Sequence, residues 1–244
     1  MKKLLLILLC VPLIFSCESQ ENNNAKIPSK NKDCETQIIF GDLTICLPEI
    51  KGMIECYSDP FIKPNVDKMA SINPGQIPIA VYVSDLVVAT NESSSQNIHK
   101  YEGFEDYPFV NVYSFKQIQN QNITLTQVKD ILSEIADKLV DLSHYDITEL
   151  NKKMSNIDDN LLLQDKPVML DRYSLHPQIE SIIMLARYTI GDQESDKLSI
   201  LNYLLIENRL ICYQYVDNYK GQETIDNLKM RNDSFGLNFI RENE

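Results

Sequence analysis

The sequence predicts an α+β fold, in which α-helices pack against an antiparallel β-sheet. Three observations carry this prediction. Apolar residues alternate in the segments 77–89 and 107–115, and they recur every three or four positions in 123–142. Three apolar segments also follow one another between residues 181 and 216. Alternation is typical of strands, and a spacing of three and four residues is typical of helices.

The chain's first structured segment, 36–50, is predicted to form a β-hairpin. Leu43, Ile45 and Leu47 alternate with polar or small residues, and Gly41-Asp42 provides turn residues between the two halves. The next segment, 63–75, is short and bounded by turn residues.

Two longer strands are expected after the hairpin. In segment 77–89, Ile79, Val81 and Val83 share one face. A polar loop, 91–97, separates this strand from segment 107–115, which alternates in the same way.

The segment 123–142 gives the clearest helix. Thr124 and Gln127 have the spacing of a capping box, and Ile123 and Val128 have that of a hydrophobic staple. Its apolar positions form one stripe and its charged positions the opposite one, as in a helix that lies on an apolar surface. The polar segment that follows, 151–160, is expected to be a connector.

The C-terminal third is predicted to be a three-stranded antiparallel meander, 181–190, 197–206 and 209–216, followed by a helix over 221–244. The middle strand carries apolar residues on both faces, so we expect both sides of the sheet to be covered. Gly236 lies inside the predicted helix and costs it up to about 1 kcal/mol.

Composition and glycine spacing exclude several functions. The chain has 35 acidic and 23 basic side chains, which argues against nucleic-acid binding because phosphate contacts need clustered Lys and Arg. No two of the seven glycines are closer than eleven residues, so a dinucleotide fingerprint or phosphate loop is not present. The sequence also lacks a Cys-x-x-Cys pair and a zinc-binding helix motif. We therefore expect no cofactor.

The N-terminus carries an export signal. Lys2 and Lys3 precede twelve apolar residues, 4–15, counting Cys10 and Pro12 among them. This run is shorter than the roughly 20 residues of a membrane-spanning helix. The sequence Ile14-Phe15-Ser16-Cys17 follows and resembles the lipobox of bacterial lipoproteins. That resemblance implies cleavage before Cys17 and a lipid anchor on its thiol. The alternative is an ordinary secretory signal with an incidental cysteine.

Residues 17–35 would then form a lipidated, flexible tether, because this stretch is polar and has no apolar periodicity. The expected organisation is a signal peptide at 1–16, the tether at 17–35, and a single α+β domain at 36–244. Loss of Lys2 and Lys3 with the signal moves the formal charge from −12 to −14. The protein is expected in the bacterial cell envelope, anchored to a bilayer at Cys17, with the choice of inner or outer membrane left open.

Four cysteines remain for disulfides: Cys34, Cys46, Cys56 and Cys212. They allow three pairings, and sequence does not choose among them. We favour Cys46–Cys56, because ten residues separate them and so short a loop closes easily. The alternative is that some of these cysteines are small buried apolar residues.

His176 is the strongest catalytic candidate. Asp171 and Glu180 lie within ten residues of each other around it, and an acid with an imidazole could transfer protons. The alternative is a loop that leads into a strand, with Pro177 fixing the turn and the charged side chains solvated.

The order of elements over residues 40–240, a helix between strand groups and a final meander followed by a helix, resembles the PsbP-like α/β fold, which bacterial lipoproteins also use. The resemblance implies a fold and no activity. Two functions follow as hypotheses. The first is a membrane-anchored envelope lipoprotein that acts by binding a ligand or an envelope protein without catalysis. The alternative is an envelope hydrolase that uses His176 with Asp171 or Glu180.

Overall fold

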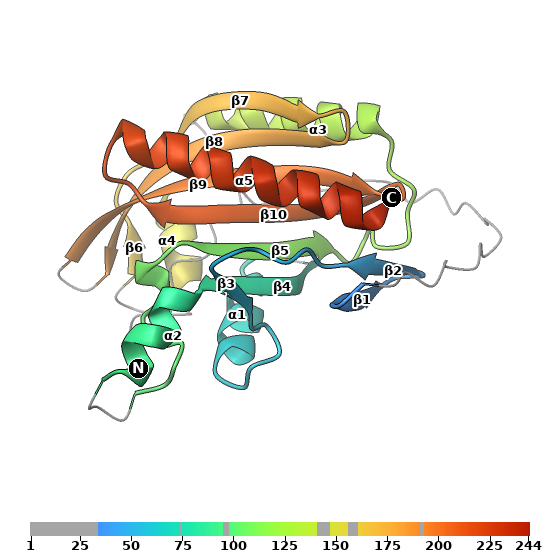
Figure 1. Ribbon diagram of the computed structural model, residues 1–244. Helices are drawn as coiled ribbons and strands as arrows, with labels where there is room; N and C mark the ends of the chain where they lie inside the picture. The colour runs from blue at the N-terminus through green and yellow to red at the C-terminus, as the bar shows by residue number, and fades with distance from the viewer. Residues whose placement is uncertain (1–33, 74, 95–97, 141–146, 156–160, 191–192) are drawn as a thin grey trace.

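The computed structural model describes residues 34–73, 75–94, 98–140, 147–155, 161–190 and 193–244. In these residues an eight-stranded antiparallel sheet is covered by helices, and a separate two-stranded hairpin lies at one end (Figure 1). The sheet order is β3-β4-β5-β10-β9-β8-β6, and β7 also pairs with β8. The predicted α+β class with an antiparallel sheet is therefore confirmed.

The elements, in chain order, are β1 (Gln37–Phe40), β2 (Leu43–Cys46), β3 (Met53–Glu55), α1 (Ile62–Ala70), β4 (Gln76–Ser84), α2 (Asp85–Glu92), the 3₁₀ turn η1 (Phe104–Asp106), β5 (Phe109–Phe115), α3 (Leu125–Val140), α4 (Ile147–Ser155), β6 (Leu161–Leu163), β7 (Val168–His176), β8 (Ile179–Ile190), β9 (Gln193–Ile206), β10 (Arg209–Asn218) and α5 (Gln222–Asn243).

The predicted hairpin and meander are both present. β1 pairs with β2 across the Gly41-Asp42 turn, where Gly41 has a φ of 63°. β8, β9 and β10 pair antiparallel in sequence order. The β9–β10 turn is Glu207-Asn208, and both residues have positive φ, as in the two-residue turns that match the twist of a hairpin.

Both faces of the sheet are covered, as the double apolar pattern of its strands predicts. On one face α1 and α3 pack over a buried cluster that includes Leu201 and Tyr203 of β9. On the other face α5 packs over a cluster that includes Ile200 and Leu204 of the same strand. Figure 1 shows α5 lying lengthwise across this second face. The molecule therefore has three layers, with the sheet in the middle.

The capping box of α3 is confirmed. The Thr124 backbone N–H donates to Gln127 Oε1 at 2.8 Å, and the Gln127 N–H donates to Thr124 Oγ1 at 3.3 Å. This reciprocal pair satisfies donors that a helix start leaves without partners.

Four segments differ from the sequence prediction. The short segment before β4 forms α1, whose Ile62, Val66 and Met69 are buried against the sheet. The strand predicted over 77–89 ends at Ser84, whose Oγ accepts a hydrogen bond from the Leu86 N–H and caps α2. The first half of the predicted connector is helical in α4. The segment expected to be a loop before β8 is a strand, β7.

The predicted Cys46–Cys56 bridge is wrong, because Cys46 is bonded to Cys34. The hairpin brings these two cysteines together: the Leu47 N–H donates to Thr36 O at 2.9 Å beside the β1–β2 ladder. Cys56 is a free, buried thiol that belongs to the cluster beneath α1, and its Sγ donates to Val81 O. The loop-length argument considered chain separation and ignored the direction of the side chains.

Gly236 allows α5 to approach the sheet closely. A Cβ atom at this position would lie 2.3 Å from Tyr213 Oη and 2.9 Å from Ile179 Cδ1. The predicted helix therefore carries a glycine because the sheet leaves no room for a side chain, and packing offsets its low helix propensity.

Candidate functional site

The structure places His176 and Glu180 at the β7–β8 turn but on opposite faces. Glu180 is paired in register with Ser174, and its Oε1 accepts a hydrogen bond from Ser174 Oγ at 2.8 Å. Lys129 Nζ on α3 lies 3.8 Å from the same oxygen. His176 is paired with Ile179, whose side chain packs in the α5 cluster on the other face.

Asp171 lies farther along β7 and does not join them. Five positions of a strand span about 16 Å, and the exposed Asp171 carboxylate accepts from the Arg172 N–H at 2.8 Å. His176 Nδ1 accepts from the Gln178 N–H at 3.3 Å, which shapes the turn. The structure therefore does not bring the three predicted catalytic side chains into one site.

Cys17, the predicted lipidation site, lies outside the described residues together with the predicted signal peptide and most of the tether. Within the described ranges, no helix has the length and apolar character needed to cross a membrane. The same ranges hold no group of three or more His, Cys, Asp and Glu side chains that could bind a metal ion.

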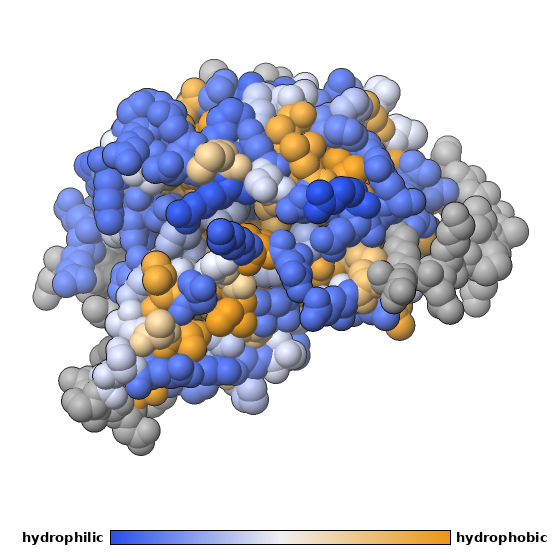
Figure 2. Space-filling view, in the orientation of Figure 1, coloured by the Kyte–Doolittle hydropathy of each residue, from blue (hydrophilic) through white to orange (hydrophobic). Residues whose placement is uncertain are grey.

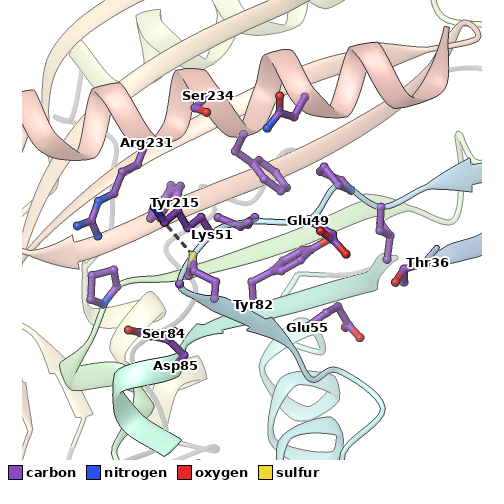
Figure 3. A pocket seen from close by; sticks show the side chains of 18 of the residues that line it. Thr36, Glu49, Lys51, Glu55, Tyr82, Ser84, Asp85, Tyr215, Arg231 and Ser234 are labelled. Carbon is purple, nitrogen blue, oxygen red and sulfur yellow. Dashed lines mark hydrogen bonds between the residues drawn. The ribbon is translucent and has the colours of Figure 1, made fainter. Parts of the chain in front are cut away.

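A groove of about 1170 Å³ lies along one side of α5, and we call it the α5 groove. One wall is α5, through residues 230–238, and the other is the segment 47–52 that connects β2 to β3 (Figure 3). The sheet forms the floor, and the start of α2 closes one end. Figure 2 shows apolar side chains gathered near this end of the molecule, close to α2.

Tyr82 lies on the floor of the α5 groove. It comes from β4, faces α5, and its ring packs edge-on against Phe235 at 5.6 Å between centroids. The residue is only 3% exposed, and its hydroxyl has no hydrogen-bond partner among the described residues. Buried hydroxyl groups in proteins are normally hydrogen-bonded, so this one marks an exception.

Acidic groups surround this hydroxyl. Glu55 is the residue opposite Tyr82 in the β3–β4 ladder, so the two side chains share a face. Burial raises the pKa of Tyr82, and the charges of Glu55 and Glu242 raise it further. Backbone donors hold Glu55 in place, since its Oε1 accepts from the Tyr57 N–H at 2.9 Å and from the Val81 N–H at 3.4 Å.

Two further acidic residues belong to the lining of the α5 groove. Glu35 and Glu49 both line it, and a hydrogen bond from Glu35 raises the pKa of Glu49. The Glu35 charge and the more distant Glu242 act in the same direction. Like charges near each other disfavour the ionised form, which agrees with the raised pKa of Glu49.

The groove's two cations differ in their surroundings. Burial raises the pKa of both Tyr215 and Asp217, and the positive charge of Arg231 on α5 lowers the pKa of both groups. The Tyr215 hydroxyl lies 3.2 Å from Met53 Sδ, so this part of the floor is packed (Figure 3). Lys51 is exposed on the opposite wall. With four lining carboxylates, Glu35, Glu49, Glu55 and Asp85, the α5 groove is acidic.

Sequence reasoning missed this groove. Tyr82 alternates with valines in a strand pattern, and such a pattern gives no information on whether a hydroxyl finds a partner. The segment 47–52 shows no periodicity that would place it beside α5. One signal was present: the segment carries two charged residues, Glu49 and Lys51, directly after the apolar hairpin.

Comparison of the chain with protein-family models, with curated proteins and with solved structures finds no match. The lipoprotein and PsbP-like resemblances therefore stay predictions made from the sequence.

Proposed function

We propose that this protein is a lipid-anchored protein of the bacterial envelope that acts by binding, and that the α5 groove is its binding site. The anchor rests on the sequence Ile14-Phe15-Ser16-Cys17. The single observation that supports binding at the groove is the buried, unpartnered hydroxyl of Tyr82 on its floor. A group that hydrogen-bonds this hydroxyl would remove a cost of about 1–3 kcal/mol to the free protein.

Two exposed apolar side chains add to this support. Leu86 at the start of α2 is 60% exposed, Met230 on α5 is 64% exposed, and both line the α5 groove. Apolar side chains around a concave site with a few polar groups are typical of binding sites. A binding role without catalysis agrees with the separation of His176 from Asp171 and Glu180 in the sheet.

A photo-crosslinking experiment tests the binding site. p-Benzoylphenylalanine is placed at Met230 in the full-length protein, and cells are irradiated before the membranes are solubilised. The matched control carries the same group at Leu237, which is exposed on α5 but outside the groove. We expect a defined adduct from position 230 and none from position 237. Equal labelling at both positions, or none at 230, contradicts a binding role for the groove.

A second experiment tests the anchor. Cys17→Ala is expected to abolish metabolic labelling with palmitate and to release the protein from membranes, because two or more acyl chains are needed for durable attachment. Continued labelling of the variant would contradict lipidation at Cys17.

A further inference from the structure

The shape and lining of the α5 groove restrict what it can bind. Its volume of about 1170 Å³ exceeds the roughly 300–1000 Å³ of a typical small-molecule site. It runs between the segment 47–52 and α5, along residues 230–238 of the helix (Figure 3). A groove of this size and shape suits an extended peptide better than a compact ligand.

The charges in the groove favour a positively charged group. Four carboxylates line the groove against two cations, Lys51 and Arg231. Glu55 and Glu242 both act electrostatically on the Tyr82 hydroxyl, which places this hydroxyl in a negative potential. A hydroxyl in a negative potential is best partnered by a cationic N–H donor, to which its oxygen is the acceptor.

The apolar part of the lining suits the residues next to such a cation. Leu86, Pro108 and Met230 line the groove, and the Phe235 ring lies beside Tyr82. The methylene stem of a Lys or Arg side chain can pack on apolar surface while its head reaches a polar partner. Apolar neighbours in the peptide can bury the exposed side chains of Leu86 and Met230.

We propose that the α5 groove binds an extended segment of a partner protein through one Lys or Arg side chain. The head of this side chain donates to Tyr82 Oη and is neutralised by the groove carboxylates, and adjacent apolar residues of the segment pack on Leu86 and Met230. This inference rests on the proposed binding function and names the chemistry of its partner.

The experiment selects ligands without assuming a sequence. The full-length protein in detergent micelles is used to select from a displayed library of random heptapeptides, and the selected peptides are measured by fluorescence polarisation. We expect peptides with a Lys or Arg flanked by apolar residues. Replacing that basic residue by norleucine keeps the stem and removes the charge, and we expect it to weaken binding about tenfold or more, as for a lost charge-assisted hydrogen bond.

Matched variants place the peptide in the groove. Tyr82→Phe removes only the hydroxyl and is expected to weaken binding about tenfold. Tyr219→Phe, which lies outside the groove lining, is expected to leave binding unchanged. Met230→Ser is expected to weaken binding more than Leu237→Ser, because Met230 alone of these two lines the groove.

Several outcomes overturn the inference. Selected peptides that are acidic or uncharged refute the charge argument, as does binding that is equal in Tyr82→Phe and the natural protein. Competition by spermidine as strong as that of the best peptide assigns the groove to small amines instead. A selection that yields no binding peptide also refutes it. In each case, a crosslink from position 230 and none from position 237 still supports the proposed binding function. If the crosslink from position 230 is absent, both the binding function and the inference about the peptide are refuted.

Discussion

Buried polar groups on the two sides of α5 differ in whether they are hydrogen-bonded. Toward β8 and β9, Asn232 on the helix and Asn202 on the sheet donate to each other at 2.7 and 3.0 Å, and Asn232 also donates to the Tyr173 hydroxyl at 3.1 Å. Tyr173 in turn donates to Asp233 at 2.7 Å. Toward β4, Tyr82 is buried like Asn202 and Asn232, but its hydroxyl has no hydrogen-bond partner among the described residues.

We propose that this difference separates stability from binding along one helix. A satisfied polar network contributes to folding and fixes how the helix sits on the sheet. An unsatisfied hydroxyl does neither, and its burial without a hydrogen bond costs about 1–3 kcal/mol. The β8 side of α5 therefore contributes to the fold through satisfied hydrogen bonds, and the β4 side carries the unpartnered hydroxyl on which the proposed binding function rests.

The largest effect is expected from Asn232→Leu. This substitution leaves the Asn202 amide and the Tyr173 hydroxyl with fewer partners, and we expect a loss of about 4 kcal/mol in the free energy of unfolding. Asn238→Leu makes the same change on the groove side of the helix and is expected to alter stability by less than about 0.5 kcal/mol. Urea unfolding measures both. Similar losses in the two variants would contradict the contrast between the two sides.

The next effect concerns the hairpin at the end of the groove. The Cys34–Cys46 bridge closes a loop with a sequence separation of 12 residues, and its removal in the double variant Cys34→Ser, Cys46→Ser is expected to cost about 3 kcal/mol. Reduction of the natural protein should lower the melting temperature to the same extent. Cys56→Ala, at a buried free thiol, provides the control, because its response to reductant should equal that of the natural protein. A melting temperature that is independent of reductant would contradict the bridge.

A third test probes the tight contact of α5. Gly236→Ala places a methyl group 2.3 Å from Tyr213 Oη, which belongs to a fully buried side chain. We expect a loss of about 2 kcal/mol, as for other overpacked sites. Tyr213→Phe removes the clashing oxygen, so the double variant should recover part of this loss. Calorimetry of the natural protein, the two single variants and the double variant gives the coupling energy between the two positions. Additive losses would contradict the clash.

Alkaline pH tests the buried tyrosines. Burial raises the pKa of Tyr213 well above 10.0, so the folded protein keeps this proton at pH values where the unfolded chain loses it. The contribution of Tyr213 to stability is therefore present below pH 10 and is lost as pH rises above it, by about 1.4 kcal/mol per pH unit. Tyr213→Phe should remove that part of the slope. Urea midpoints at pH 9, 10 and 11 measure the slope of stability against pH for both proteins. An unchanged slope in Tyr213→Phe would contradict the contribution of Tyr213.

The sequence predicted the parts of the fold that depend on local pattern. The capping box at Thr124, the turn at Gly41 and the two-faced strand β9 follow from residue spacing, and the structure confirms them. Predictions that needed tertiary context were wrong. α2 was assigned to a strand because its apolar residues continue those of β4, and only the Ser84 cap marks the change to a helix.

The site could not be predicted for a related reason. The lining of the α5 groove comes from β2–β3, β4, β10 and α5, which are far apart in the chain. The catalytic hypothesis at His176 used nearness in sequence, but His176 pairs with Ile179 across the β7–β8 turn. Ile179 and Glu180 are neighbours in β8 and point to opposite faces, which separates His176 from Glu180. Whether a buried hydroxyl has a partner depends on all the elements around it, and no local pattern encodes that.

The smallest effect is the sharpest test of the comparison, because the same substitution should change stability in opposite directions on the two sides of α5. Tyr173→Phe removes a hydroxyl that donates to Asp233 and accepts from Asn232, and it is expected to lower the free energy of unfolding by about 1 kcal/mol. Tyr82→Phe removes a buried hydroxyl without a partner and should raise the free energy of unfolding by about 1 kcal/mol, since desolvation of that group is no longer required. Urea unfolding of the protein without peptide measures both changes. A loss of stability in Tyr82→Phe would mean that the hydroxyl already has a partner in the free protein, and the β4 side of the helix would then be as closed as the β8 side.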